Sequence, residues 1–340
     1  MAKTKIGRFP TISVVIATFN SGKTLARCLS RIRSQNYPQA KIEILLGDGG
    51  STDNTAALAA KFGAKIISIP THQQNAEFNR GTAFNRAKNE FVLILDHDNF
   101  LTTDNYLKEL LEPLLLHPEV VASESCFYHY DRKNSLLDRY YALFGTIEPV
   151  PFYFGKADKL MQTSHYWNLH GQAKDYGRYY LVSFDNDPLR FPTIGTNGCL
   201  MRRKIVFANA DIRPAYHFPI DVMVDLVAKG HNSFAFVKNS LLHLTGARGV
   251  FTFLKRRVSF VEKYHFTDGP RRRYSVYMPG DEWNLLKFIF YSLTFIKPTW
   301  DAWQGYRQIR DPAWFIHPIM CLGITFAYGW GTIKNKFTHL

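Results

Sequence analysis

Residues 91–98 read Phe-Val-Leu-Ile-Leu-Asp-His-Asp, an apolar run that ends in two spaced carboxylates. An uninterrupted apolar run of this length is typical of a strand that is buried on both faces. Because side chains alternate along a strand, Asp96 and Asp98 point to the same side. Two carboxylates on one side form a hard oxygen site that suits Mg²⁺ or Mn²⁺. The same residues also fit an Asp-rich turn, and the stretch alone does not separate the two interpretations.

Three apolar runs nearer the N-terminus have the length and composition of strands. Residues 12–20 read Ile-Ser-Val-Val-Ile-Ala-Thr-Phe-Asn and open onto a polar turn. Residues 42–46 read Ile-Glu-Ile-Leu-Leu and lead into a Gly-rich turn that begins at Gly47, and a third run, 65–69, stops at Pro70. We therefore predict strands over these three segments, with the 91–95 run as the fourth.

Helices are expected between these strands. Apolar residues recur at helical spacing over residues 24–35. The turn after residue 48 offers an N-cap for a helix that begins near residue 55, and another helix is expected over about 75–89. This alternation predicts βαβ units and a mostly parallel sheet. Right-handed crossovers would then bring the polar ends of three strands to one edge of the sheet, where open α/β sheets bind ligands.

The order of these segments resembles family 2 of the inverting glycosyltransferases, which have the GT-A fold. The resemblance is carried by Val-Val-Ile-Ala-Thr-Phe-Asn (14–20), Gly-Asp-Gly-Gly-Ser-Thr-Asp-Asn-Thr (47–55) and Leu-Ile-Leu-Asp-His-Asp-Asn (93–99). It is clear over about 11–125 and continues more weakly to about 245. It implies an α/β fold of the GT-A type, with a Rossmann-like, mostly parallel central sheet and helices on both faces.

The resemblance also implies a nucleoside-binding role for the first two strand ends. In that family the first turn and the Asp after the second strand hold the nucleoside of a nucleotide-sugar, which maps onto Thr18, Asn20 and Asp48. An Arg on the helix before the metal motif often lies near the base or the diphosphate, and Arg80 occupies that place. The family's usual Arg-Asn pair reads Arg80-Gly81 in this chain.

Metal and diphosphate binding are implied for the third strand end. The Asp-x-Asp element of the family corresponds to Asp96-His97-Asp98, with the metal on Asp96 and Asp98 and the donor diphosphate beside them. In many relatives a His after a late strand completes the metal shell or touches the diphosphate, and His243 fits that position. Neutral imidazole is a good Mn²⁺ ligand, although a lone His after an apolar run is also compatible with a structural role.

The middle of the chain should supply the acceptor side. Gly195 permits close backbone approach to a ligand, and Asn197 offers a hydrogen bond to a sugar or phosphate; an ordinary Gly-rich turn is the alternative. The resemblance implies an acidic general base at the start of a later helix, which maps onto Asp221, with Asp225 as a second candidate. Asp221 also fits a plain first-turn acid that is favoured by the helix dipole.

Length and composition agree with one large domain and an appendage. The chain has 340 residues, 46% of them hydrophobic, which is enough for an extensive core. Four widely spaced cysteines form neither a metal motif nor a disulfide framework, which predicts a reduced, cytoplasmic setting: Cys28, Cys126, Cys199 and Cys321. The basic segment 1–10 precedes a strand-like run, so no signal peptide is expected.

The net charge of +14 is concentrated in the second part of the chain. Residues 1–150 contain 17 Lys and Arg against 15 Asp and Glu, whereas residues 151–340 contain 25 against 13. A basic cluster that includes Arg248, Arg256 and Arg257 fits donor phosphates, lipid phosphates or a solvated face. Nucleic acid is not expected, because no nucleic-acid-binding motif accompanies the charge. An anionic membrane surface is the expected partner, because apolar segments follow directly.

Two apolar stretches near the C-terminus predict membrane association. Residues 283–296 are too short to span a bilayer comfortably, and residues 313–333 are long enough but contain Pro318 and three glycines. Trp and Tyr side chains flank both stretches, as interfacial aromatics do. We predict interfacial or re-entrant helices at the cytoplasmic face of the membrane, with a single span or a buried soluble core as alternatives. The predicted domains are a catalytic domain over 1–245, divided into a nucleotide-sugar half (1–125) and an acceptor half (126–245), and a membrane-associated region over 246–340.

These observations predict an inverting glycosyltransferase of glycan or polysaccharide synthesis that depends on Mn²⁺ or Mg²⁺. The expected donor is a UDP- or GDP-sugar and the expected acceptor is lipid-linked or a glycan, with Asp221 removing the proton of an acceptor hydroxyl. If the acceptor is a polyprenyl phosphate, its oxygen is already ionised and Asp221 loses that role. A nucleotidyltransferase is an alternative, but residues 17–22, Ala-Thr-Phe-Asn-Ser-Gly, make a poor phosphate loop. The second alternative is a non-catalytic membrane-associated binding protein, which would keep its function after loss of Asp96 or Asp98.

Overall fold

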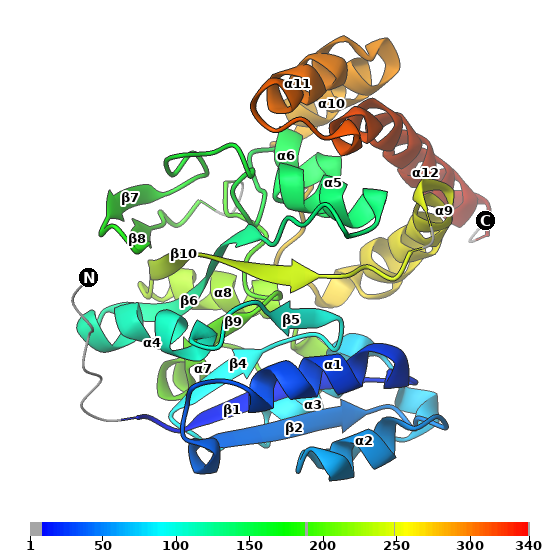
Figure 1. The fold of residues 1–340 in the computed structure, drawn as a ribbon. Helices are drawn as coiled ribbons and strands as arrows, with labels where there is room; N and C mark the ends of the chain where they lie inside the picture. The colour runs from blue at the N-terminus through cyan, green and yellow to red at the C-terminus, as the bar shows by residue number, and fades with distance from the viewer. Residues whose placement is uncertain (1–8, 188–189, 248, 339–340) are drawn as a thin grey trace. The chain divides into compact units, whose positions relative to one another are not determined.

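The computed structural model describes residues 9–187, 190–247 and 249–338, and it divides the chain into two compact units (Figure 1). Unit 1 contains Met1–Cys126, Gly171–Asn186 and Ile194–His243, and unit 2 contains Phe127–His170, Asp187–Thr193 and Leu244–Leu340. The last passage from unit 1 to unit 2 falls close to the predicted domain boundary at 245. Unit 2 also takes in residues 127–170, which lie inside the predicted catalytic domain.

One ten-stranded sheet runs through the described residues, in the order β3-β2-β1-β4-β9-β6-β10-β8-β7, with β5 paired to β10. All seven residues of β1 and all four of β4 are buried, as expected for strands that are covered on both faces. The strands are β1 (Ile12–Thr18), β2 (Ile42–Asp48), β3 (Lys65–Ser68), β4 (Phe91–Ile94), β5 (Asn99–Leu101), β6 (Val120–Tyr128), β7 (Gln172–Asp175), β8 (Tyr179–Ser183), β9 (Cys199–Arg202) and β10 (Ser233–His243).

The first four strands pair as the sequence predicts, and the rest of the sheet does not. β1 runs parallel to both β2 and β4, and β2 runs parallel to β3. Antiparallel pairing joins β4 to β9, β9 to β6, β10 to β8 and to β5, and β8 to β7. The prediction of a mostly parallel sheet is therefore wrong in its second half, and the sheet is mixed. Regular strand–helix alternation ends after β4, and antiparallel pairs need no crossover helix.

Helices cover both faces of the parallel half. In Figure 1, α1 (Gly22–Arg33) and α2 (Thr55–Lys61) lie in front of the strands, and α3 (Ala76–Phe84) lies behind them. This follows from the strand order, because right-handed crossovers that run in opposite directions place their helices on opposite faces. α3 ends at Phe84, five residues before the predicted end near 89.

The later candidate residues of unit 1 lie on α8 and β10. α8 (Pro219–Ala228) begins with proline at its first helical position, where the missing N–H has no intrahelical acceptor to lose. Asp221 lies in the first turn of this helix. β10 is one continuous strand of 11 residues that ends at His243. α4 (Tyr106–Leu116) and α7 (Arg203–Asn209) also belong to unit 1.

Unit 2 packs helices around an aromatic core. Trp314 is fully buried, and its ring meets the ring of Phe144 edge-on at 4.8 Å between centroids. His317 stacks on the other side of the same cluster, 3.9 Å from the Phe144 centroid. The helices of unit 2 are α5 (Leu136–Phe144), α6 (Pro149–Tyr153), α9 (Val250–Val261), α10 (Glu282–Thr294), α11 (Ile296–Gln308) and α12 (His317–Thr338).

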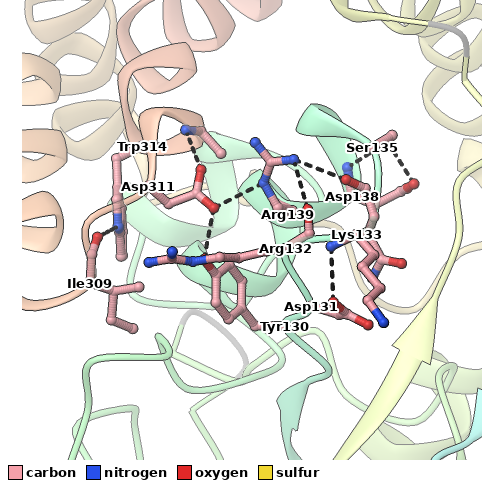
Figure 2. Close-up of polar contacts among 12 residues, drawn as sticks. Tyr130, Asp131, Arg132, Lys133, Ser135, Asp138, Arg139, Ile309, Asp311 and Trp314 are labelled. Atoms are coloured by element: carbon pink, nitrogen blue, oxygen red, sulfur yellow. Dashed lines mark hydrogen bonds and ion pairs between the residues drawn. The ribbon is translucent and has the colours of Figure 1, made fainter.

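The Asp311 carboxylate anchors the segment at which the C-terminal part of the unit 2 core begins (Figure 2). Asp311 caps the short helix Pro312–Ile316, because its Oδ1 accepts the Ala313 N–H at 2.8 Å. Its Oδ2 accepts the Tyr130 hydroxyl at 2.7 Å and pairs with the Arg139 Nε at 2.9 Å. Burial alone would raise the pKa of Asp311, but these hydrogen bonds and the Arg139 charge outweigh it and hold the pKa below its usual value.

The two apolar C-terminal stretches are helical. Residues 283–296 form α10 and the first residue of α11, and residues 313–333 form most of the short helix Pro312–Ile316 and α12. One side of α12 is buried in the unit 2 core through Met320 and Ile324. Across the described ranges no helix combines the length and the apolar character needed to cross a membrane.

Candidate active site

The ends of β1 and β2 meet in a direct hydrogen bond. Thr18 and Asp48 are partners in the parallel register of these strands, and the Thr18 hydroxyl donates to Asp48 Oδ1 at 2.8 Å. Asp48 also accepts the Ser51 N–H at 2.8 Å and the Ser51 hydroxyl at 2.5 Å. Two predicted nucleoside-binding residues thus lie side by side, and Asp48 holds the Gly-rich turn in place.

Asn20 ties the first turn to the second. Its backbone has a φ of 50°, in the left-handed region that Asn tolerates better than most residues. The Asn20 N–H donates to the Ser51 hydroxyl at 2.8 Å, and the Asn20 side-chain oxygen accepts the Thr52 N–H at 2.9 Å. Asn20 is exposed, so it lies at the solvent side of this corner.

A buried cation organises the third strand end. The Arg80 side chain is 4% exposed, and its guanidinium donates to Asp96 Oδ1 at 2.7 Å and pairs with Glu77 as well. Burial would raise the pKa of Asp96, but the Arg80 charge, supported by His243 and His97, lowers it below its usual value. The Asp96 carboxylate is therefore held ionised, with 24% of its side chain exposed.

The second carboxylate of this strand end lies in the same neighbourhood. Burial, Asp98 and then Asp96 all raise the pKa of the Cys28 thiol, so both carboxylates approach this one buried side chain on α1. His97, between them in sequence, turns toward α1 and shares a 2.7 Å hydrogen bond with the Thr24 hydroxyl through Nδ1. His97 therefore contacts the helix that follows β1. β4 ends at Ile94 and His97 and Asp98 lie in a turn, so the predicted strand alternation of Asp96 and Asp98 is not observed.

His243 is held by the residue that follows Asp98. The Asn99 side-chain amide lies 2.8 Å from His243 Nδ1, and in this orientation the buried Asn99 Oδ1 has no hydrogen-bond partner. Amide orientation and His tautomer are assigned from such networks. The Asn99 amide nitrogen also donates to Asp98 Oδ1 at 3.4 Å. A rotated amide would instead pair its oxygen with a proton on Nδ1 and leave the lone pair on His243 Nε2.

The predicted acceptor residues meet around the start of α8. Gly195 has a φ of 105°, and a Cβ on it would lie 3.0 Å from the Pro219 carbonyl oxygen, so the Gly195 turn requires glycine and packs on the first residue of α8. The Gly195 N–H donates to Glu124 Oε2 at 3.1 Å. Asp221 is fully buried, and Asn197 is 8% exposed.

Two further candidates have structural partners. Asp225 accepts the N–H of Asp211 at 2.9 Å and so fixes the loop before α8. Arg257 pairs with Glu148 at 2.8 Å and lies over the Phe253 ring, which holds it within unit 2. Arg248 lies outside the described residues.

Several residues of this edge were not singled out from the sequence. Asn99 and Glu77 contact His243 and Arg80, and Glu124 binds the Gly195 turn. Glu124 carried a usable signal, because a carboxylate inside the apolar strand β6 is unusual. Glu77 did not, because an acid in the first turn of α3 is already explained by the helix dipole.

The carboxylates that follow β4 are the candidate metal ligands. In the part of the chain that the structure describes, no three His, Cys, Asp or Glu side chains form a group that could hold a metal ion, so the predicted ligands Asp96, Asp98 and His243 are not brought together as one set. Two adjacent carboxylates on one strand end fit Mg²⁺ or Mn²⁺, because these ions commonly bind through one or two carboxylates and take other ligands from water and substrate phosphates.

Residues 13–174 match the family model described as Glycosyl transferase family 2. The match contains all three polar strand ends, Thr18 with Asn20, Asp48, and Asp96 with Asp98. Together with the α/β sheet, this similarity supports the coarse prediction of a GT-A-like α/β fold.

Individual relatives are similar to parts of the chain. Glycosyltransferase AglE of Haloferax volcanii is 32% identical over 93 residues, which cover 26% of this chain and 31% of that protein. A second relative, from Methanococcus voltae, is 33% identical over 108 residues, which cover 30% of this chain and 33% of that protein. Its name is dolichyl N-acetyl-alpha-D-glucosaminyl phosphate 3-beta-D-2,3-diacetamido-2,3-dideoxy-beta-D-glucuronosyltransferase. The chain thus spans about a third of the length of these relatives. A solved structure, mannosyltransferase PcManGT from Pyrobaculum calidifontis in complex with GDP-Man and Mn²⁺, covers 95% of this chain and 88% of that one, at 16% identity and a TM-score of 0.49.

Proposed function

We propose that the protein is a metal-dependent inverting glycosyltransferase that moves a sugar from a UDP- or GDP-sugar to an acceptor. The observation that carries the proposal is the row of polar groups on the neighbouring parallel strands β2, β1 and β4. The Thr18–Asp48 pair offers hydroxyl and carboxylate oxygens to a nucleoside. In the turn that follows β4, Asp96 and Asp98 offer a metal–diphosphate site beside the buried Arg80.

The metal would be held by Asp96 and Asp98. Asp96 uses Oδ1 for Arg80, so the metal would take Oδ2. When bound, Mn²⁺ or Mg²⁺ neutralises the charge that develops on the departing diphosphate. Arg80 adds a fixed positive charge on the same side and keeps Asp96 ionised.

His243 would add an imidazole to this site. With a proton on Nδ1 that is held by the Asn99 oxygen, Nε2 keeps its lone pair for a cation. A metal-binding His commonly donates its other N–H to an oxygen in this way. Asn99 is then a positioning residue, because it acts on the metal site only through His243.

Asp221 would act as the base on the acceptor side. A carboxylate in this place accepts the proton of an acceptor hydroxyl as that oxygen attacks the sugar, and one displacement inverts the anomeric carbon. The Gly195 turn and Asn197 would line the sugar and acceptor. The name of the Methanococcus voltae relative, a transferase onto a dolichyl-phosphate-linked sugar, supports a lipid-linked acceptor. The cytoplasmic membrane face is part of the same proposal.

The test is nucleotide release from a panel of UDP- and GDP-sugars with Mn²⁺, comparing wild type with Asp98→Asn. Loss of one group that stabilises the leaving charge should lower turnover about a hundred-fold or more. The matched control is Asp104→Asn, beyond β5, where the carboxylate is 65% exposed, and its activity should equal wild type.

Any of three results would contradict the proposal. Equal turnover by Asp98→Asn and wild type would remove the metal site from the mechanism. Thermal stabilisation by nucleotide-sugars without any turnover would favour a binding protein. Release of pyrophosphate from a nucleoside triphosphate and a sugar phosphate would favour a nucleotidyltransferase.

A further inference from the structure

α10 of unit 2 is apolar on two opposite faces. Trp283, Leu286, Phe290 and Leu293 are 56–67% exposed. Their spacing of three and four residues places them on one stripe along the helix. The other side of α10 is buried in the unit 2 core through Phe288. A helix at the surface of a domain ordinarily turns a polar face to water, so this exposed stripe indicates a partner.

α12 repeats the pattern. Ile319, Phe326, Trp330 and Ile333 are 49–63% exposed and are spaced by seven, four and three residues, which again gives one stripe. The opposite side packs into the unit 2 core through Ile324. Two helices of one compact unit therefore each have a core face and an exposed apolar face.

α11 adds aromatic side chains and a groove. Ile296, Trp300 and Trp303 are 46–74% exposed. With Phe295 and Phe315 they line a groove of about 540 Å³ that joins the end of α10 to α11 and to the helix before α12. We call the exposed stripes of α10, α11 and α12 and this groove the outer apolar face.

The charge of the same region is strongly positive. Residues 244–340 contain fourteen Lys and Arg against six Asp and Glu. Three of these acids, Asp268, Asp281 and Asp311, are at most 2% exposed, so they contribute little to the surface. Exposed lysines follow directly on the stripes, Lys287 after Leu286 and Lys334 after Ile333. Apolar side chains rimmed by positive charge are complementary to an anionic lipid surface.

We infer that the outer apolar face docks unit 2 in the plane of an anionic bilayer surface. Four of the protein's six tryptophans lie on this face, and tryptophan is enriched at the boundary between membrane and water. Each stripe is only one side of a helix whose other side is packed in protein, which suits an interfacial helix. α10 has 13 residues and is about 20 Å long, too short for a hydrocarbon core of roughly 30 Å.

This inference specifies the membrane contact of the proposed function, and it rests on unit 2 alone. The test is cosedimentation of the full chain, without any nucleotide-sugar, with vesicles of phosphatidylcholine and with vesicles that also contain phosphatidylglycerol. We expect binding to the anionic vesicles that weakens with salt, together with a blue shift of tryptophan emission. The double variant Trp300→Ser/Trp303→Ser should bind the anionic vesicles at least ten-fold more weakly, equal to about 1.4 kcal/mol.

The matched control is Tyr166→Ser, which removes an aromatic side chain that is 69% exposed elsewhere in unit 2 and should bind vesicles like wild type. Equal binding by the double variant and wild type would overturn the inference, and so would the absence of binding to either kind of vesicle. A wild-type dimer that the double variant converts to monomer, with no vesicle binding, would show instead that this face joins two copies. Vesicle binding that persists while every nucleotide-sugar fails to bind would refute the proposed function and leave the docking face intact.

Discussion

Arg80 shows how one buried side chain organises the candidate donor site. Its guanidinium contacts both Asp96 and Glu77, and little of it reaches solvent. A buried charge that loses its partners is costly, so these three residues depend on each other. The position of Arg80 followed from the resemblance, and Glu77 is its neighbour one turn earlier on α3, but the contact with Asp96 required the tertiary structure.

Replacing Arg80 with Gln should destabilise the protein and weaken the acidic site. Asp96 and Glu77 would lose their shared cation, at a cost on the order of 3 kcal/mol. Urea unfolding measures the change, and Arg86→Gln is the control, because Arg86 is exposed on the same segment and should change stability by less than about 0.5 kcal/mol. Equal unfolding midpoints for Arg80→Gln and wild type would show that the pair contributes nothing to the fold.

Asn99→Ala should lower Mn²⁺ affinity, although Asn99 is not itself a proposed ligand. Without its amide the His243 ring loses the hydrogen bond that fixes the tautomer, which commonly costs about ten-fold in metal affinity. Titration of Mn²⁺ followed by paramagnetic resonance measures this without any turnover. Asn105→Ala, at an exposed position between β5 and α4, should bind Mn²⁺ like wild type. Unchanged affinity in Asn99→Ala would remove His243 from the metal site.

The strand-end residues were predictable because they depend on local pattern. An apolar run that stops at Asp48 or Asp96 signals a buried strand and a polar end within a few residues. The Asn99–His243 contact joins residues 144 apart in sequence, and no periodicity relates them. Such a contact depends on the antiparallel pairing of β5 with β10, which the local pattern does not specify.

At the scale of elements, the packing of α3 explains why glycine stands at position 81, where the family usually has Asn. The helix lies against the turn at Pro214–Tyr216, and a Cβ on Gly81 would come within 2.7 Å of His217 Cβ and 2.9 Å of Pro214 Cα. Asn in this place, as in the family's usual pair, would collide with both. The absence of a side chain is thus a packing requirement between α3 and that turn.

Gly81→Ala should therefore destabilise unit 1, despite the higher helix propensity of alanine. Forcing a methyl group into a packed contact typically costs about 1–3 kcal/mol. Gly329→Ala is the matched control, since Gly329 is a helical glycine with open space around it, and it should be neutral or stabilising by up to about 1 kcal/mol. Thermal unfolding compares the two variants, and a stabilised Gly81→Ala would show that α3 and the turn are not in contact.

The direction of the later strands of the sheet could not be predicted from the sequence. β1 to β4 alternate with helices, and that alternation predicts parallel neighbours. β6, β9 and β10 pair across long sequence separations, so their direction is set by tertiary packing. The apolar character of these segments does not indicate strand direction either, because buried parallel and antiparallel strands can both be apolar.

At the scale of the whole molecule, the chain leaves unit 1 after Cys126 and returns to it at Gly171, and a second excursion covers Asp187–Thr193. The sequence indicated a domain boundary near 245 and a division of the catalytic domain at 125/126, but no return of the chain to the first unit. Residues 127–170 join unit 2 through core residues such as Tyr140 and Phe144. The aromatic side chains of that core surround one imidazole, His317.

The neutral state of His317 makes unit 2 sensitive to acid. The ring is fully buried, with the Tyr140 hydroxyl 2.8 Å from Nδ1 and the Tyr153 hydroxyl 3.0 Å from Nε2. Burial, and then the charge of Lys297, lower the pKa of His317 to about 3. The unfolded chain takes up a proton on this ring below its ordinary pKa of about 6.5, whereas the folded chain does not. Stability is therefore complete above pH ~6.5 and falls as the pH drops toward ~3, by up to about 1.4 kcal/mol per pH unit.

His317→Gln should remove this dependence, because glutamine does not titrate. Urea unfolding between pH 7 and pH 4, followed by tryptophan emission, should show wild type losing stability more steeply than the variant over that interval. His72→Gln, at an exposed position, should keep the wild-type slope. Carboxylates titrate in all three proteins, so the difference between slopes isolates His317. Parallel curves for wild type and His317→Gln would mean that the ring is protonated in the folded state as readily as in the unfolded chain, and that its aromatic surroundings do not exclude the charge.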